Sequence, residues 1–459
     1  IYGSCRKIHG PEPDMMRSLG RLLNDPNATR PEVLFLGGDQ IYADDVDEKL
    51  LPHISLLGLE LIGRPEPIPG LPAGALSPLA NRAKYLGKKV FTSGHADHHL
   101  LTFGEYAATY LFAWNVEIWK RTAGPGTTEI PASDASFGAA AARRVLANMV
   151  TYMIFDDHEI TDDWFLNDAW RKKAIATDWA DRVMTNGLSA FWAFQGWGNQ
   201  PDTFNNNFLE SIEAFTRRGE RASDASFLLI THGQWSFLAP TSPPTLVLDT
   251  RTGRGSSKRH ADRAPRGELN KQSIAYLKYG YRPTPKLAPR NTDAPRLLGS
   301  LERNRLNKLL SDAVGSVSPL IIIAPAPILG FRPIEEVQET VGSFSPAAGD
   351  LESWSANPRN LVDFLHLLLQ NGIEKVAILS GDVHYAFEIA STISVPKGTL
   401  QIAQFCSSAF KNKPTGSNLA GAKFLRKQGS ARRSMAWWDF RKGSDGPITR
   451  HHAEPVSYT

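Results

Sequence analysis

Three segments of the sequence begin as apolar runs and end abruptly in carboxylates, or in a carboxylate and a histidine. They read VLFLGGDQIYADD from Val33, TYMIFDDHEITDDW from Thr151 and VAILSGDVHYA from Val376. Each apolar run is typical of a buried β-strand, and ligands collect at the carboxyl ends of strands in open α/β sheets. Convergent carboxylates repel one another unless a cation lies between them. The three segments therefore predict a metal-dependent hydrolase with an α/β fold.

Composition narrows the class of protein. The 459 residues are 42% hydrophobic and 21% charged, which is ordinary for a globular enzyme. We find no apolar run of the ~18–20 residues that a membrane span needs. The net charge of +4 suits an anionic small-molecule substrate and gives thin support for extended nucleic-acid binding. Two cysteines exclude a disulfide framework. We expect a monomer; no signal-peptide pattern is present, and the compartment stays open between export and the cytoplasm.

The order of expected elements indicates the architecture. Strands alternate with helices early and late in the chain, and paired strands occupy the middle, which predicts two mixed β-sheets flanked by helices. Residues 165–220 are expected to be mostly helical, and Leu57 to Ser77 to form a surface loop. Thr102 is the expected N-cap of one helix, with Glu105 completing a capping box. The main expected helices are Met15–Leu23, Leu101–Trp119, Ala139–Asn148, Ser300–Ala313 and Asn360–Gln370.

The first carboxylate segment places Asp39 at the end of its strand. Gly37 and Gly38 allow the backbone to turn sharply directly after the apolar run, and Tyr42 follows three residues later. The alternative is that Asp39 only caps a turn. Four acidic residues come next: Asp44, Asp45, Asp47 and Glu48. We expect them to form the solvent-exposed start of a helix, in preference to binding a metal.

The other two segments combine carboxylates with histidine. Asp156, Asp157 and His158 follow the second strand directly, and ionisable groups in such a row need partners or solvent. His158 is a natural general acid because its ordinary pKa lies near the working range. Asp382 and His384 are two residues apart and share a side if the chain stays extended. An exposed, merely charged loop is the alternative for the second segment.

A further cluster contains three histidines. His95, Asp97, His98 and His99 could bind zinc, but their spacing is too tight for one tetrahedral site. We expect them to cap the following helix or to support a neighbouring site.

The motifs SCR, GDQIYAD, DDHE, LDTR and SGDVH, in this order, resemble the PhoD-type alkaline phosphatases of the calcineurin-like metallophosphoesterase superfamily. The resemblance extends to the LTFGEYAATYLFAW and DLESWSANPRN segments. It implies a four-layer sandwich of two mixed sheets between helices. One domain would cover residues 1–410, with a helical insertion at about 165–220 and a basic extension at 411–459. It implies hydrolysis of phosphomonoesters or phosphodiesters by a metal-activated hydroxide. Ferric iron (Fe3+) and calcium are the implied metals, with zinc, manganese and magnesium as alternatives.

The resemblance also implies roles for particular residues. Cys5 would be a thiolate ligand of the ferric ion, Tyr42 would add a phenolate, and Asp39 would bridge the metals. Asp157, with Asp156 beside it, would bind the second metal. This sequence has Asp163 in a stretch where family members often carry Asn, and we include it as a ligand.

The remaining implied roles concern the phosphate and the third segment. His158 would protonate the leaving group or steady the phosphate, and Arg251 would bind the phosphate through its planar fork. Asp382 and His384 would each supply a ligand to one metal site. Two alternatives stay open: a nuclease-type phosphodiesterase, and a non-catalytic calcium-binding protein.

Overall fold

The computed structural model describes residues 1–413 except 87–89, 92, 124–132, 219–224, 226–228, 231–234, 256–294, 313–318, 331–334, 336–351, 357 and 396–397. The described chain divides into two compact units. The first unit contains residues 1–164, 169–235 and 409–413, and the second contains 165–168 and 236–408. Most of the predicted extension at 411–459 lies outside the described residues.

The sheet of the first unit is small and parallel. Its described strands are β1 (Tyr2–Gly3), β2 (Val33–Leu36) and β3 (Val150–Met153), in the order β1-β2-β3. Gly3 pairs with Leu36, and Leu36 pairs with Met153, so the three strands end in register. The segments that follow them therefore leave the sheet at one edge, the edge where α/β proteins gather ligands.

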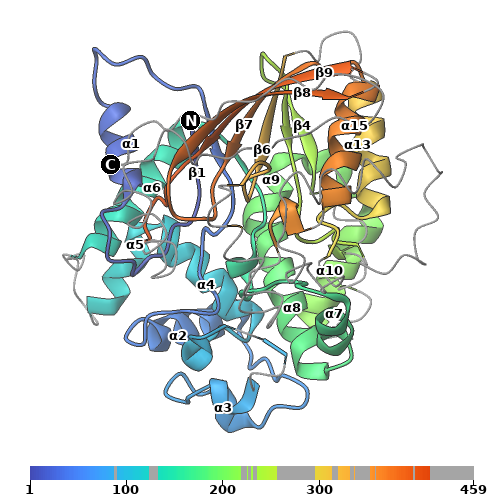
Figure 1. Cartoon of the computed structure of the whole chain (residues 1–459). Coiled ribbons are helices and arrows are strands. Elements are labelled where there is room, and N and C mark those ends of the chain that lie inside the picture. The colour runs from blue at the N-terminus through green and yellow to red at the C-terminus, as the bar shows by residue number, and fades with distance from the viewer. Residues whose placement is uncertain are drawn as a thin grey trace, which may run out of the picture. The chain divides into compact units, whose positions relative to one another are not determined.

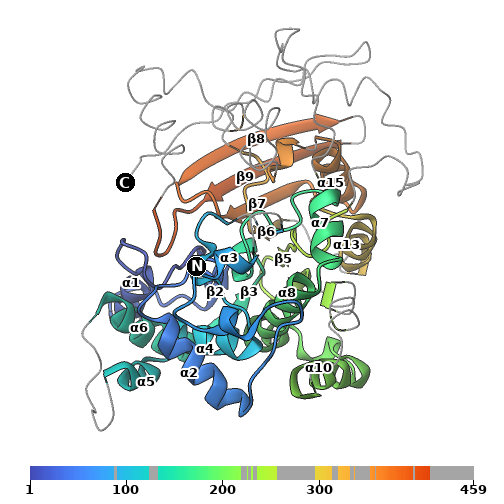
Figure 2. The same ribbon diagram turned by 90° about the horizontal axis from the view of Figure 1, so that it is seen from below.

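Two helices pack against this sheet. They are α1 (Met15–Leu22) and α6 (Asp134–Asn148), which lie side by side in Figures 1 and 2. Their apolar faces form a buried core with the strands, made of Met16, Leu19, Leu34, Leu36, Ala142, Val145, Met149 and Met153. The start of α6 at Asp134 precedes the expected start because Ser133 caps the helix, with Ser136 in a capping box.

A second helix pair contains α2 (Leu51–Ile62) and α4 (Phe103–Trp114). Thr102 caps α4 and Glu105 completes the capping box, as predicted. The expectation of a loop from Leu57 is wrong, because α2 continues to Ile62 and ends at Gly63 in the left-handed region (φ 73°). The sequence became rich in Pro and Gly only beyond that point, and the loop prediction began too early.

The helical character expected for residues 165–220 is confirmed. The helices there are α7 (Asp168–Ile175), α8 (Asp178–Phe191), α9 (Trp197–Asn199) and α10 (Asn206–Arg218). Short helices α3 (Ala83–Leu86) and α5 (Val116–Trp119) complete those described before α6.

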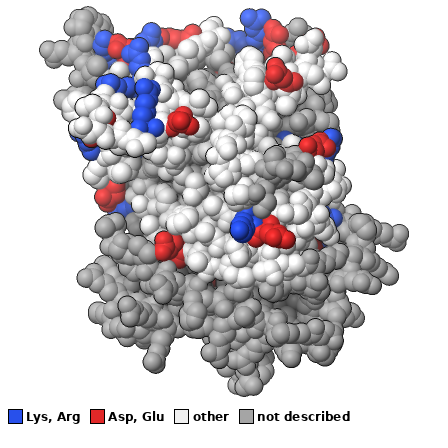
Figure 3. All heavy atoms as spheres, turned by 90° about the horizontal axis from the view of Figure 1, so that it is seen from above, with Lys and Arg blue, Asp and Glu red and all other residues white. Residues whose placement is uncertain are grey.

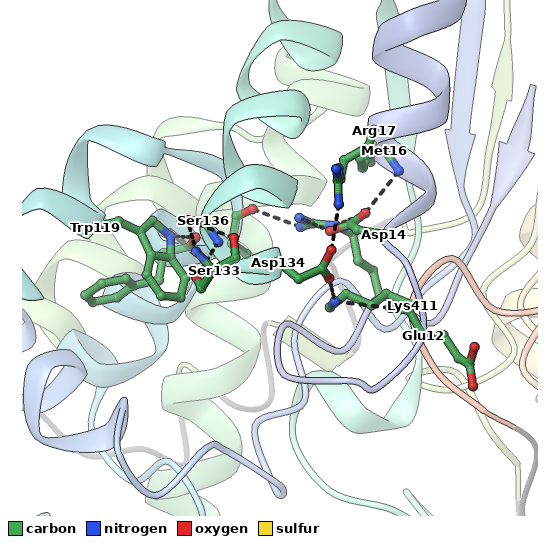
Figure 4. Close-up of polar contacts among 12 residues, drawn as sticks. Glu12, Asp14, Met16, Arg17, Trp119, Ser133, Asp134, Ser136 and Lys411 are labelled. Carbon is green, nitrogen blue, oxygen red and sulfur yellow. Dashed lines mark hydrogen bonds and ion pairs between the residues drawn. The ribbon is translucent and has the colours of Figure 1, made fainter. Parts of the chain in front are cut away.

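Residues 409–413 run beside the N-terminal segment of the same unit. The Phe410 amide donates to the Ser4 carbonyl (2.8 Å), and the Lys411 amide donates to the Cys5 carbonyl (3.2 Å). Figure 4 shows Asp134 between Arg17 and Lys411, and Lys411 is buried in its ion pair with Asp134. Residues 409–413 therefore hold the backbone on both sides of Cys5.

The sheet of the second unit is larger and mixed. Its order is β4-β5-β6-β7-β9-β8, with antiparallel pairs only at its two ends. Figure 2 shows β8, β9, β7, β6 and β5 in this sequence across the sheet. The pair of β4 and β5 is antiparallel and accounts for paired strands that were expected in the middle of the chain. The strands are β4 (Phe237–Ala239), β5 (Thr245–Val247), β6 (Leu320–Ala324), β7 (Lys375–Ser380), β8 (Phe387–Val395) and β9 (Gly398–Cys406).

Helices α13 (Ser300–Asp312) and α15 (Pro358–Gln370) lie side by side and pack against this sheet (Figure 1). The buried residues between them and the strands include Leu306, Leu310, Phe364, Leu368, Ile322, Ile378 and Ile402. The predicted α/β fold, with two sheets flanked by helices, is thus confirmed. The packing of the sheets into four layers stays a prediction. None of the described helices has the length and apolar character of a membrane span.

Candidate metal centre

The loop after β2 turns sharply and buries a carboxylate. Gly38 has φ +110°, and a Cβ at this position would lie 2.3 Å from the Cβ of Asp156. Only glycine therefore fits between the loops that follow β2 and β3. The next residue, Asp39, is fully buried with φ 54°. The double glycine predicted this turn, and the structure places Asp39 at the strand end as expected.

Ligand atoms from both loops converge at this edge of the first unit. One ligand atom each from Asp39, Asp157 and His158 lie within 4.8 Å of one another. A carboxylate oxygen of Asp156 lies within the same distance of Asp39 and Asp157. Cys5, which follows β1, places its Sγ within 4.8 Å of an Asp39 oxygen. Carboxylate and thiol donors together suit a transition-metal ion better than calcium alone.

Cys5 is held there by its backbone. Its amide donates to the Gly38 carbonyl (3.1 Å), and the next amide, of Arg6, donates to the Asp39 carbonyl (2.8 Å). The side chain is fully buried, and the backbone has φ 58°. The segment after β1 thus continues to pair with the loop after β2, which brings the thiol to the carboxylates.

Tyr42 contacts two of the predicted site residues. Its hydroxyl donates to Asp39 Oδ2 (3.2 Å), and its ring stacks on the imidazole of His158 at 4.5 Å between centroids. The predicted phenolate donor therefore lies beside the predicted bridging carboxylate.

His158 forms a buried pair with Asp44. His158 Nδ1 lies 2.9 Å from Asp44 Oδ1, and the amide of Asp162 donates to Asp44 Oδ2 (2.9 Å). Burial lowers the pKa of His158, but the Asp44 carboxylate and then Asp157 and Asp39 outweigh burial and raise it well above its ordinary value. The raised pKa favours the charged imidazolium form, and Asp44, by bonding Nδ1, leaves Nε2 on the side that faces away from it.

The expectation that Asp44 belongs to a solvated helix start is wrong, because its carboxylate is fully buried against His158. The expectation fits its neighbours better. Asp47 Oδ1 accepts from the amides of Lys49 and Leu50 just before α2 begins, and Glu48 is exposed. No local pattern indicates the pairing of residues 44 and 158, which lie 114 positions apart.

The second unit holds three further predicted residues, Asp382, His384 and Arg251. Asp382 and His384 follow β7 and are partly exposed. Arg251 follows β5, and its guanidinium lies 3.6 Å from Asp382 Oδ2. The structure thus brings the predicted phosphate contact together with one predicted metal ligand of the same unit.

Arg251 has a buried partner that sequence reasoning missed. Glu352 forms ion pairs with both Arg251 and Arg254, and all three side chains are buried. Burial raises the pKa of Glu352, but the two guanidinium groups outweigh burial and lower it to about 2. The loop itself is fixed by Asp249, whose Oδ1 accepts from the amides of Arg251 (2.8 Å) and Thr252 (2.9 Å). Glu352 lies in the DLESWSANPRN segment that carried the family resemblance.

Backbone strain marks the same residues in both units. Among the described residues, six non-glycine residues have a positive φ, and five of them are predicted ligands. The five are Cys5, Asp39, Asp163, Asp382 and His384; the sixth is Phe165. Left-handed backbone is uncommon outside glycine and clusters at functional sites, where surrounding structure holds it.

Two further expectations concern Asp163 and the histidine cluster. Asp163 has φ 62°, but it joins none of the groups of three or more close ligand atoms within the described ranges. The same holds for the cluster around His95, so the described residues give no support for a zinc site there. His99 is buried with Nδ1 2.6 Å from the Leu100 carbonyl, and its ring stacks on Phe91, which indicates a structural role.

No protein-family model matches the sequence, and no curated protein matches it. A solved structure titled "Structure of PhoD" superimposes with a TM-score of 0.46 at 12% sequence identity. The match covers 89% of this chain and 56% of that chain, so this chain spans about half the length of the protein it matches.

Proposed function

We propose that this chain is a metal-dependent phosphoesterase that hydrolyses phosphomonoesters or phosphodiesters. The observation that carries the proposal is the convergence of Asp39, Asp157 and His158 within 4.8 Å at the carboxyl edge of the first sheet. The motif resemblance supports it, because the converging residues are those for which that resemblance implied roles. The strained backbone at the predicted ligands supports it further.

The residues present fit a metal ion. Buried carboxylates gathered this closely need a compensating cation, and Cys5 and Tyr42 add the donors that favour iron over calcium. We propose iron with a second ion, calcium or another divalent metal. When bound, such ions lower the pKa of a water molecule and neutralise charge on a phosphoryl group.

His158 has the properties of a proton donor. Because its Nδ1 is bonded to Asp44, its Nε2 is the nitrogen available to a substrate. The raised pKa keeps that nitrogen protonated. We propose that Nε2–H donates to the oxygen of the leaving group or to the phosphoryl group, with stacking on Tyr42 limiting rotation of the ring.

The second unit contributes residues with roles that rest on the resemblance. Arg251 is the proposed phosphate contact, and Asp382 and His384 are proposed as further metal ligands, as is Asp163 in the first unit. Glu352 orients the guanidinium of Arg251 through its ion pair, so this group is held in place before a substrate binds.

The test compares hydrolysis of p-nitrophenyl phosphate and bis(p-nitrophenyl) phosphate by the protein as purified, after chelation, and after reloading with iron and calcium. The proposal predicts turnover of at least one ester, its loss on chelation and its recovery on reloading. Undiminished turnover by the stripped protein would contradict it.

The two alternatives receive less support. Figure 3 shows both acidic and basic side chains of the described residues on one face, and the net charge of +4 gives thin support for extended nucleic-acid binding. A structural calcium site draws oxygen ligands from one contiguous loop. Here the ligand atoms come from loops after three different strands and include a thiol.

A further inference from the structure

We propose that Glu159 is a positioning residue that sets the spacing between the two loops carrying Asp39 and Asp156. The inference rests on the proposed metal centre and adds to it a residue for which neither the motifs nor the resemblance supplied a role. Glu159 is fully buried, and it does not join the groups of close ligand atoms among the described residues.

The carboxylate of Glu159 links the two strand ends. Its Oε2 accepts from the amide of Asp39 (3.0 Å) and from the amide of Asp156 (3.0 Å). Its Oε1 accepts from the amide of Gln40 (2.8 Å). A single oxygen is therefore bonded to the loop after β2 and to the loop after β3, and the distance between the two ligand-bearing backbones depends on it.

A side chain from a distant helix supports the carboxylate. Gln195 Nε2 donates to Glu159 Oε1 (3.0 Å) and lies 3.0 Å from the Tyr110 hydroxyl. Gln195 is buried and belongs to a π-helical turn, Trp192–Gly196, that follows α8. Single π turns are rare and occur often at functional sites. Here the turn places the amide against Glu159.

This arrangement explains how the strained loop is maintained. Asp39 keeps φ 54°, and such a backbone persists only where the surroundings over-determine it. The acceptors on Glu159 fix the amides of Asp39 and its neighbour, and the same carboxylate fixes Asp156. Residues that orient metal ligands in this way typically contribute about 10–100-fold to metal affinity.

The experiment uses the full chain, stripped of metal and titrated with Mn²⁺, with binding followed by EPR. Glu159→Gln keeps the shape of the side chain but turns one acceptor oxygen into a donor that faces backbone N–H groups. Glu105→Gln is the matched control, since Glu105 is also a buried carboxylate that accepts from a backbone amide, that of Leu101 (2.9 Å), and pairs with Arg82. Urea denaturation of both stripped variants measures the general cost of losing a buried carboxylate.

We expect Glu159→Gln to weaken Mn²⁺ affinity about 10–100-fold. Glu105→Gln should change it by less than about twofold, as for independent sites, even where it destabilises the fold as much. Equal Mn²⁺ affinity of Glu159→Gln and the unmodified protein would overturn the inference and leave the proposed function intact. An unmodified protein that binds no Mn²⁺, iron or calcium would overturn both.

A second variant covers the case in which Glu159→Gln does not fold. Gln195→Met removes the side-chain donor to Oε1, together with its contact to the Tyr110 hydroxyl, and leaves the bonds to the backbone amides in place. The inference predicts weaker Mn²⁺ binding by a smaller factor than for Glu159→Gln. Unchanged Mn²⁺ affinity in a folded Gln195→Met protein would count against the positioning role of Glu159.

Discussion

At the scale of single residues, the pair of His158 and Asp44 gives the proposed reaction its proton donor. The buried carboxylate of Asp44 forms a hydrogen bond with Nδ1 of His158. The same carboxylate holds the His158 pKa above its ordinary value, which favours the imidazolium form. The charge on His158 and the orientation of its ring therefore have one common origin. Asp44 is a positioning residue on this account.

Asp44→Asn tests that origin. Without the carboxylate, the His158 pKa falls, so the imidazole loses its proton at a lower pH. We expect kcat to drop about 100-fold, the lower end of the contribution of a positioned general acid, and the alkaline limb of the pH–rate profile to move to lower pH. Asp45→Asn is the control, because Asp45 pairs with Lys7 and lies 3.6 Å from His9. A profile that stays in place in Asp44→Asn would contradict the assignment.

At the scale of elements, the turn between β2 and Asp39 depends on glycine at position 38. A Cβ there would meet Asp156, and φ is +110°. Gly63, which ends α2, also has a positive φ (+73°), but nothing lies within 4 Å of the position of its Cβ. Substitution of Gly63 therefore measures backbone strain alone, whereas substitution of Gly38 adds a steric clash with Asp156.

Gly63→Ala should cost about 1–2 kcal/mol of unfolding free energy, from strain alone. Gly38→Ala should cost more and should also weaken metal binding, because Asp156 must move. Urea denaturation and metal titration measure the two effects. Equal costs and unchanged metal affinity in both variants would show that the contact between the loops is unimportant.

The loop that carries Arg251 depends on Glu352. Glu352→Gln leaves buried guanidinium groups without their carboxylate and should destabilise the protein by about 3–5 kcal/mol at pH 7. The Glu352 pKa is lowered to about 2. Its stabilising contribution is therefore present above the unfolded value near 4.5 and is lost as the pH falls toward 2.

The difference between the unmodified protein and Glu352→Gln should consequently shrink as the pH falls below about 4.5. Chemical denaturation at a series of pH values measures it. Glu213→Gln provides the comparison, because the exposed pair of Glu213 with Arg217 should contribute no more than about 0.5 kcal/mol. A difference in unfolding free energy that grows as the pH falls would refute the assignment of a negative charge to Glu352.

At the scale of the whole molecule, local patterns predicted elements well and predicted long-range pairings poorly. The strand before Asp39, the cap at Thr102 and the helices near residues 15 and 300 follow from apolar periodicity and capping chemistry. The partners of His158, Arg251 and Glu159 lie 101–120 residues away in sequence or on unrelated elements. No local pattern encodes such a pairing, so Asp44 and Glu352 emerged only from the structure.

The proposed site follows from the sequence to the extent that its proposed ligands come directly after strands. Cys5, Asp39 and Asp157 each follow a strand of one parallel sheet, and parallel register brings them together automatically. The residues that position those loops carry no distinctive sequence pattern. Glu159 is one more acidic residue after Asp156 and Asp157, and Gln195 is a glutamine in an aromatic-rich helical segment. Their roles depend on burial and on long-range contacts, which no local sequence pattern predicts.

The account depends most on the metal ions that Asp39 is proposed to bind. The decisive measurement is elemental analysis of the purified protein and of Asp39→Asn, paired with hydrolysis of the two aryl phosphates; exposed Asp202→Asn serves as the control. We predict iron with a second metal in the unmodified and control proteins, and loss of both metal and nearly all turnover in Asp39→Asn. Full turnover by metal-free Asp39→Asn protein would contradict the account.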